Sequence, residues 1–217
     1  MARGTKQIDG QLVLDMCLNT SNYVCQANSL IGGKQALSIN SAKIIRSAIM
    51  QVVREDSELR TYKVTISELA ELLNVSRNNL YRDIGKISDE ILKSHVEIRL
   101  EQEGDAVRWK KINWVSFIEY QSDVGLAIKL NNDLKPYLLN LKQRYTQYTL
   151  DNILAMKSIY AIRIYELLQE QIRSMSMPFC GMDIELSVEY IRQSCGCEKK
   201  YERFSQFKEK VIDAAMM

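Results

Sequence analysis

The chain has 217 residues, a length that suits one large domain or two of ordinary size. Hydrophobic residues make up 46% of the chain and charged residues 26%, which is close to the globular average and argues against a disordered chain. The net charge of +2 is too small to indicate a nucleic-acid partner by itself, because such binding depends on where basic residues cluster.

The sequence contains no sign of a membrane segment, a secretion signal or a metal site. No run approaches the roughly 18 apolar residues of a membrane span, and the first residues lack the apolar core of a signal peptide. The five cysteines show no C-x-x-C spacing, and His95 is the one histidine. We therefore expect a cytoplasmic protein with free thiols, no metal, no cofactor and no membrane partner.

Catalytic motifs are missing as well. The sequence lacks the phosphate-binding G-x-x-x-x-G-K-[ST], the zinc-protease H-E-x-x-H and the hydrolase G-x-S-x-G patterns. A tyrosine nucleophile for DNA strand cleavage would need a metal-binding histidine cluster, which one histidine does not supply. We expect that the protein is not an enzyme.

Residues 1–34 combine small and polar side chains, and we expect an irregular lead-in there. Ser38 is then placed to cap a helix. The buried face of this helix is predicted to comprise Ile39, Ile45, Ala48 and Val52.

A helix-turn-helix pattern follows. Thr65 and Glu68 have the spacing of a capping box, in which each side chain bonds the other residue's backbone N–H. The first helix carries one apolar stripe made of Ile66, Leu69, Ala70 and Leu73. Residues 74–76 interrupt the stripe, so a second helix is predicted from Arg77. Its buried face is predicted to comprise Leu80, Ile84, Ile87 and Ile91.

A β-hairpin is predicted directly after the second helix. Val96, Ile98 and Leu100 alternate with charged residues, residues 104–105 mark a turn, and a period of two resumes with Val107, Trp109 and Lys111. Helix-turn-helix followed by a hairpin is the order of a winged helix. Arg108, Lys110 and Lys111 would lie either on a DNA-contacting wing or on the solvent face of a sheet. Four aromatic residues are assigned to packing: Trp109, Trp114, Phe117 and Tyr120.

The order of elements recurs after about residue 149. One long helix is indicated by Ile153, Met156, Tyr160, Ile164 and Leu167, and Ser187 can cap a short one. A break at residues 195–197 precedes another helix, striped by Phe204, Phe207 and Val211, and no hairpin follows. We predict an α+β fold of tandem winged-helix domains: a first at residues 35–148 and a second, without its wing, at residues 149–217.

Basic residues gather around the last predicted helix. The long side chains of lysine and arginine can donate hydrogen bonds to phosphates and to guanine edges, and hydroxyl or amide side chains can make further contacts with DNA. Alternatively, the same charges form a solvated helix face. The candidate DNA-binding residues there are Lys199, Lys200, Arg203, Ser205, Gln206, Lys208 and Lys210. The comparable residues of the first module, whose basic bias is weaker, are Ser76, Arg77, Asn78, Arg82 and Lys86.

Two segments resemble iteron-binding plasmid replication initiators. Residues 154–168 are similar to the family's K-S-x-Y-A-I-R-x-Y-E-L-L segment. Residues 201–215 are similar to its Y-x-x-F-x-x-F-K-x-x-V-L-x-x-A recognition-helix region, with Ala214 in place of the usual proline. Residues 113–118, residues 134–139 and the helix-turn-helix also resemble this family.

The resemblance implies that the second winged helix reads iteron repeats in the major groove, and that the first serves dimerisation and DNA backbone contacts. It adds Tyr201 to the candidate DNA contacts. The implied protein is a plasmid replication initiator that binds double-stranded origin DNA, forms homodimers through its first domain and recruits host initiator or helicase proteins. A winged-helix transcriptional repressor and a protein-interaction module that does not bind DNA are the alternatives.

Overall fold

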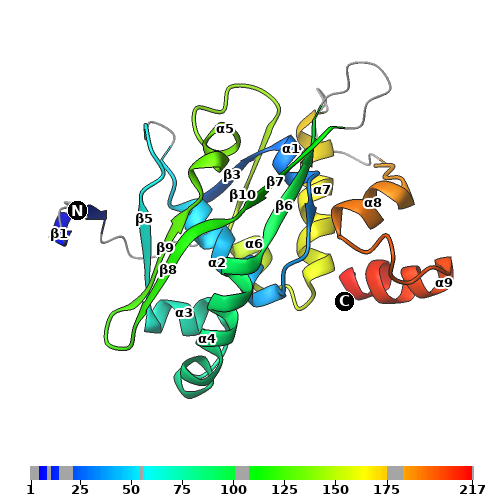
Figure 1. Cartoon of the computed structure of the whole chain (residues 1–217). Helices are drawn as coiled ribbons and strands as arrows, with labels where there is room; N and C mark the ends of the chain where they lie inside the picture. Colours follow the sequence, from blue (N-terminus) through cyan, green and yellow to red (C-terminus); the bar gives the residue numbers. More distant parts are fainter. Residues whose placement is uncertain are drawn as a thin grey trace.

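The computed structural model describes residues 5–8, 11–14, 22–53, 56–100, 108–174 and 183–216. Helices and small sheets are mixed along the chain, which confirms the α+β class (Figure 1). The central helix α2 (Ile39–Met50) is followed by the helix-turn-helix pair α3 (Ile66–Leu73) and α4 (Arg77–Lys93). The later long helix, α7 (Ile159–Ser174), separates this region from the C-terminal helices in Figure 1.

The strands of the described residues form four small antiparallel sheets. Two are pairs: β1 (Thr5–Ile8) with β2 (Gln11–Leu14), and β3 (Tyr23–Ala27) with β10 (Tyr145–Thr149). The third has the order β4 (Lys34–Gln35), β6 (His95–Arg99), β7 (Trp109–Asn113). The fourth has the order β5 (Thr61–Thr65), β9 (Gly125–Leu130), β8 (Val115–Gln121).

The remaining helical segments are short. They are α1 (Asn28–Ile31), η1 (Asn132–Leu134), α5 (Lys135–Leu138), α6 (Asp151–Leu154), α8 (Val188–Ser194), α9 (Phe204–Phe207) and the π-helical η2 (Lys208–Asp213). In the described part of the chain, no helix is long and apolar enough to cross a membrane.

The helix-turn-helix forms as its sequence predicts. The Thr65 side chain accepts a hydrogen bond from the Glu68 N–H, and the Glu68 carboxylate accepts one from the Thr65 N–H, which completes the capping box. Asn74 takes a left-handed conformation (φ 53°) that ends α3, and Ser76 caps α4. The buried residues of α4 are the four predicted ones, Leu80, Ile84, Ile87 and Ile91.

The predicted hairpin also forms, as β6 and β7, but it is not the hairpin beside the helix-turn-helix. β5, the strand just before α3, pairs with β9, and β9 pairs with β8. The Tyr81 hydroxyl on α4 donates to the Ser122 carbonyl in the β8–β9 turn, at 3.4 Å. β8–β9 is therefore the wing of the first module, and the basic residues of β7 lie on another hairpin.

The aromatic residues divide between core and surface. Trp114 is fully buried as predicted, but Trp109 is 55% exposed and Tyr120 is 37% exposed. The register explains the error at Trp109, because Val96 pairs with Ile112 and both side chains are buried. Since side chains alternate along a strand, Trp109 and Lys111 fall on the outer face.

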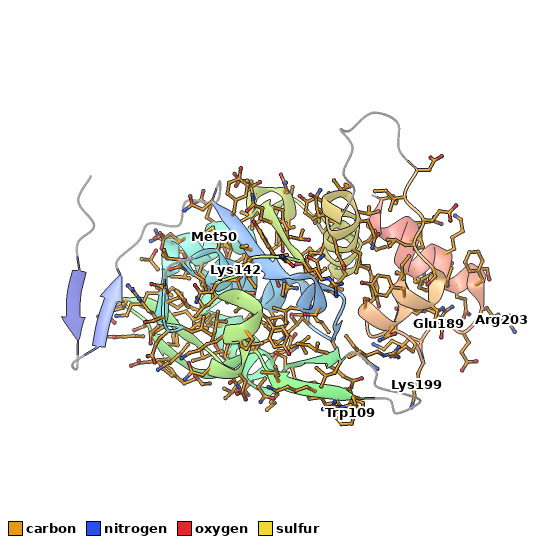
Figure 2. The ribbon with its side chains drawn as sticks, turned by 90° about the horizontal axis from the view of Figure 1, so that it is seen from above. Met50, Trp109, Lys142, Glu189, Lys199 and Arg203 are labelled. Carbon is orange, nitrogen blue, oxygen red and sulfur yellow. The ribbon has the colours of Figure 1, made fainter. Side chains whose placement is uncertain are left out.

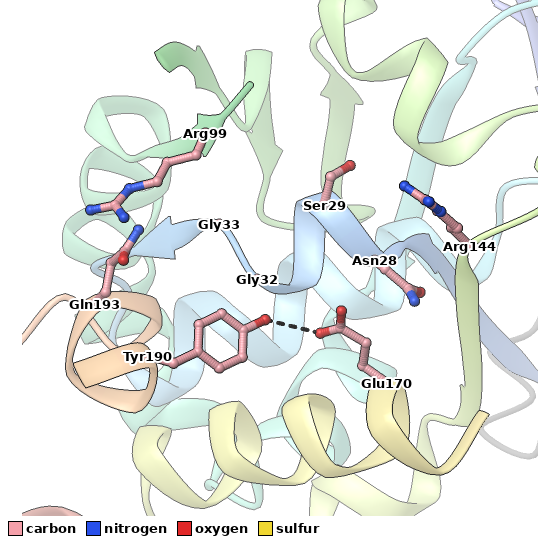
Figure 3. Close-up of a pocket in the computed structure, with 9 residues that line it drawn as sticks. All are labelled: Asn28, Ser29, Gly32, Gly33, Arg99, Arg144, Glu170, Tyr190 and Gln193. Carbon is pink, nitrogen blue, oxygen red and sulfur yellow. Dashed lines mark hydrogen bonds between the residues drawn. The ribbon is translucent and has the colours of Figure 1, made fainter. Parts of the chain in front are cut away.

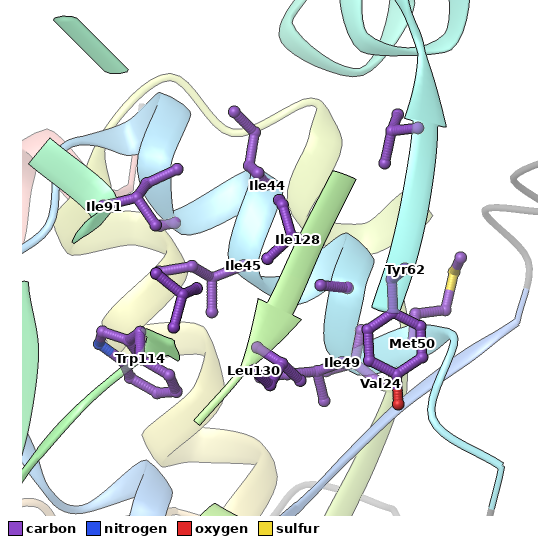
Figure 4. Packing of buried hydrophobic residues seen from close by; sticks show 14 of the residues in the cluster. Val24, Ile44, Ile45, Ile49, Met50, Tyr62, Ile91, Trp114, Ile128 and Leu130 are labelled. Atoms are coloured by element: carbon purple, nitrogen blue, oxygen red, sulfur yellow. The ribbon is translucent and has the colours of Figure 1, made fainter. Parts of the chain in front are cut away.

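The main core closes around α2 (Figure 4). Every residue from Ser41 to Met50 is buried, so the one-sided face predicted for this helix is wrong. The lead-in also departs from prediction, because β3 pairs with β10, and Val24 and Leu30 are fully buried. β10 lies more than a hundred residues after β3 in the chain, so no local pattern reveals this strand pairing.

The predicted long helix of the second half is interrupted. α6 ends at Leu154 and α7 begins at Ile159, where the Ser158 hydroxyl accepts a hydrogen bond from the Tyr160 N–H at 3.2 Å. Packing crosses the predicted boundary near residue 149 in both directions. Ile162 of α7 belongs to the main core, and Ile31 belongs to the smaller C-terminal cluster. The boundary stays a prediction.

Candidate nucleic-acid interface

The segment before α9, residues 198–203, is called here the basic turn. Lys199, Lys200 and Arg203 are exposed, and no ion pair with another described residue engages them. Tyr201 is partly buried, in a left-handed backbone conformation (φ 55°), and its ring meets that of Tyr160 edge-on at 6.5 Å. The turn thus presents three basic side chains on the side of the molecule where Figure 2 labels Lys199 and Arg203.

The basic turn is held by Arg192 of α8, a residue that the sequence did not single out. Its guanidinium donates to the carbonyls of Lys200 at 2.9 Å and Tyr201 at 2.7 Å. The same group lies 4.3 Å from the centre of the Phe207 ring, which is fully buried. Arg192 therefore ties the turn to the helix that follows it.

Arg192→Ala is expected to weaken DNA binding by roughly 1–2 kcal/mol, because two hydrogen bonds that shape the basic turn are lost. Fluorescence anisotropy with labelled duplex DNA measures this, and circular dichroism checks that the helices remain. Gln193→Ala, next to it on α8, is the control. Arg192→Lys keeps the positive charge but loses the planar guanidinium that donates to two carbonyls at once. Full binding by this variant would contradict the positioning role.

Helix α9 and the π-helical segment η2 continue the candidate surface. Ser205 and Gln206 are exposed, as is Phe204 (60%), which the sequence pattern had placed on the buried stripe. Phe207 and Val211 are buried and seat these helices on α7 and α8. The outer positions of this segment are therefore available to a partner.

Two of the candidate lysines are already neutralised. Lys208 donates to the Asp213 carboxylate at 2.7 and 2.9 Å. Lys210 donates to Glu209 at 2.7 Å, and this bond raises the pKa of Lys210. A phosphate would have to compete with these carboxylates. Within this segment, the basic residues without an ion pair to another described residue are therefore those of the basic turn.

The first-module candidates lie along the exposed side of α4. Ser76 is occupied as the helix cap, and Arg77 donates to the Ser67 hydroxyl at 2.7 Å. Arg82 pairs with Asp83 at 3.0 Å, which raises the pKa of Arg82 and lowers that of Asp83. Asn78 and Lys86 are exposed as well. The first set lies along α4, and the second lies on the basic turn, α9 and η2. Figure 1 shows α4 and α9 on different parts of the molecule.

A buried ionic cluster joins α2, β10 and α7. Glu166 of α7 is fully buried, and its carboxylate accepts hydrogen bonds from Arg46 of α2 at 2.9 Å and from Tyr148 of β10 at 2.5 Å. Arg163, one turn earlier on α7, pairs with the same carboxylate at 2.5 Å. Burial alone would raise the pKa of Glu166, but the two arginines outweigh it and hold the pKa at about 2. The sequence did not reveal this cluster.

Arg163 also fastens α8 to the turn between α1 and β4. Its guanidinium donates to the carbonyls of Ile31, Gly33 and Ser194. The Ser194 hydroxyl donates to the Gly32 carbonyl at 3.1 Å. The C-terminal helices are thus attached to the turn between α1 and β4 by buried polar contacts as well as by apolar packing.

A cavity of about 710 Å³ opens between these elements (Figure 3). Tyr190 of α8 donates to the Glu170 carboxylate at 3.1 Å inside it. Burial raises the pKa of both groups, that of Tyr190 to about 12. Arg99 and Arg144 lie on its opposite walls. Within the described residues, no cluster of three or more metal-ligating side chains occurs here or elsewhere.

Comparison with known proteins finds relatives among replication initiators. A replication initiation protein of Escherichia coli is 24% identical over 194 residues, which cover 87% of this chain and 59% of that protein. An uncharacterized 27.6 kDa protein of Escherichia coli is 27% identical over 171 residues, which cover 72% of this chain and 70% of that protein. This chain therefore spans 59% of the length of the first relative.

Among solved structures, the crystal structure of the Pi initiator protein in complex with iteron DNA has a similar fold. The TM-score is 0.67 at 18% identity, and the match covers 91% of this chain and 85% of that one. This likeness confirms the winged-helix fold. Residues 23–169, well over half of the chain, match the family described as Initiator Replication protein, WH1, and the chain belongs to this family of replication initiators.

Proposed function

We propose that this protein initiates plasmid replication by binding repeated origin DNA through α9 with the basic turn, and through α4. The observation that carries the proposal is the exposed basic turn, shaped by Arg192 at the start of a helix whose outer side is open. The Pi initiator, whose fold is similar, is described in complex with iteron DNA, and one relative is named a replication initiation protein.

The chemistry of the side chains decides which residues are assigned to phosphates and which to base edges. Lys199 and Lys200 would contact phosphates, which fix the position of the protein on the duplex. Arg203, Ser205 and Gln206 would reach base edges in the major groove, because the first residues of a recognition helix contact the bases. α4 would add contacts through Arg77, Asn78, Arg82 and Lys86. We propose no catalytic step for the chain itself.

We also propose that the protein forms homodimers through its first module. β8 is an edge strand of the sheet β5-β9-β8, so its outer backbone groups have no strand partner among the described residues. An unpaired edge can join the same edge of a second copy. Recruitment of host initiator or helicase proteins, in the cytoplasm where plasmid DNA is replicated, completes the proposal.

Gel shifts with the origin of the encoding plasmid test this function. An initiator is expected to bind direct repeats there, with an affinity well above that for unrelated DNA. Preference for an inverted repeat at a promoter would favour a repressor instead. Absence of binding to any origin fragment at low salt would sink the proposal and favour a protein-interaction module.

Lys200→Ala is expected to weaken binding to every sequence alike and to reduce the salt slope, the dependence of log K on log salt, by about one. The reason is the loss of one phosphate contact. Anisotropy titrations between low and physiological salt measure the slope. Lys142→Ala, an exposed lysine far from the basic turn in Figure 2, should leave it unchanged. A sequence-dependent loss would instead identify Lys200 as a base-reading residue.

A further inference from the structure

The outer face of the sheet β4-β6-β7 carries an exposed tryptophan that the proposed contacts leave unused. Trp109 is 55% exposed, whereas Trp114, the other tryptophan of the chain, is fully buried. The Lys111 ammonium lies 4.9 Å from the centre of the Trp109 ring, and Arg99 is its cross-strand neighbour. We call Arg99, Trp109 and Lys111 the hairpin face. It combines a large flat apolar surface with two cations.

A row of contacts links the hairpin face to the basic turn. Lys34, Glu97 and Lys111 are neighbours across the three strands, so about 10 Å separates the first from the last. Glu97 pairs with Lys111 at 3.3 Å, and Lys34 pairs with Glu198, the first residue of the basic turn. The hairpin therefore lies beside the segment that leads into α9, and Figure 2 shows Trp109 and Lys199 on the same side of the molecule.

The charge of the two strands suits an anionic partner. Arg108 and Lys110 are exposed too, but they alternate with Trp109 and Lys111 and so belong to the other face of the strand. Glu97 is the one acidic residue among the described residues 95–100 and 108–113. Acidic residues do occur in the connection between the strands, which lies outside the described residues. The contact is accordingly assigned to the strands themselves.

We infer that the hairpin face binds the sugar–phosphate backbone of the duplex that α9 enters, as a contact surface supplied by the first module. Arg99, which forms no ion pair with another described residue, pairs with a phosphate, and the Trp109 ring packs against the neighbouring deoxyribose. Lys111 is held beside the ring by its pair with Glu97. Such contacts position a protein on DNA without reading sequence. The inference rests on the proposed function and extends it to a further surface. From the sequence, Lys111 was expected on a wing or on the solvent face of a sheet, and Trp109 was expected in the core.

Tryptophan fluorescence tests the contact directly, because Trp109 is the exposed one of two tryptophans. The full chain is titrated with a duplex from the plasmid origin and with an unrelated duplex of equal length at low salt. Anisotropy of a dye on the DNA follows binding independently. Both duplexes are expected to quench Trp109 and to protect it from acrylamide, and Trp109→Phe should abolish the change.

Two outcomes of this titration separate the inference from the function. DNA binding by anisotropy without any change in Trp109 emission or acrylamide access overturns the inference and leaves the proposed function standing. Failure to bind either duplex overturns the proposed function, and the inference falls with it.

Variants supply a second, independent readout. Arg99→Ala and Trp109→Ala are expected to weaken binding to both duplexes by a similar factor of about three to ten, and Arg99→Ala to lower the salt slope by about one. Lys142→Ala is the control and should bind normally. If the face instead serves a protein partner, both hairpin variants bind DNA as the parent does, and the inference is overturned.

Discussion

Replacing Glu166 by glutamine is expected to lower the free energy of unfolding by roughly 3–5 kcal/mol. The carboxylate is fully buried between Arg46 and Arg163, and glutamine would leave two buried guanidinium charges without a counter-charge. Because typical domains are stable by only about 5–15 kcal/mol, the variant should unfold at much lower urea concentration or temperature. Urea denaturation followed by circular dichroism measures the loss.

Glu170→Gln on the same helix is the matched control for this effect. The Glu170 carboxylate accepts a hydrogen bond from the Tyr190 hydroxyl at the cavity, and Glu170 forms no ion pair with another described residue. Its replacement should lower stability by about 1 kcal/mol or less. Equal losses in the two variants would show that the charge pairing of Glu166 is not what stabilises this region.

The pH dependence of stability gives a second readout of Glu166. Burial raises its pKa, but Arg46 and Arg163 lower it to about 2 from an ordinary value of 4.5. The folded pKa is the lower one, so the unfolded chain binds more protons between these values. The contribution is therefore complete above about pH 4.5 and is lost as the pH falls towards 2. Glu166→Gln should flatten this part of the stability curve.

Arg203→Ala is expected to weaken specific DNA binding by about 1–3 kcal/mol and to relax the preference for one base pair. Arg203 stands at the N-terminal cap of α9, is exposed, and makes no ion pair with another described residue. Its planar fork can donate two hydrogen bonds to one guanine. A binding series over single-base variants of the origin repeat measures both the loss and the preference.

Glu202→Gln and Arg203→Lys sharpen this test. Glu202 is the exposed neighbour of Arg203, and its replacement should not weaken binding, because a negative charge near phosphates is removed. Lysine keeps the positive charge of Arg203 but lacks the planar guanidinium with its paired N–H donors. Arg203→Lys should therefore retain affinity for DNA of any sequence and lose the preference for one base pair. Unchanged selectivity in Arg203→Ala would show that this residue does not read bases.

The sequence alone determined the elements whose signals are local. The Thr65–Glu68 capping box, the Ser76 and Ser187 caps and the buried stripe of α4 all formed where predicted. Helix caps and the apolar faces of helices depend on residues within about one or two helical turns, so they can be predicted without knowledge of tertiary contacts. The concentration of basic residues before and within α9 was equally visible, as was the family resemblance, which the match over residues 23–169 confirmed.

The tertiary structure decided what depends on distant partners. Which hairpin lies beside the helix-turn-helix follows from the pairing of β5 with β9, and the exposed place of Trp109 follows from the register with β6. A slip of one residue reverses the faces of a strand, so alternation alone could not place that side chain. Arg46 and Glu166 stand 120 residues apart and meet in the core. Burying a charge is tolerable only beside its counter-charge, and only the folded chain brings the two together.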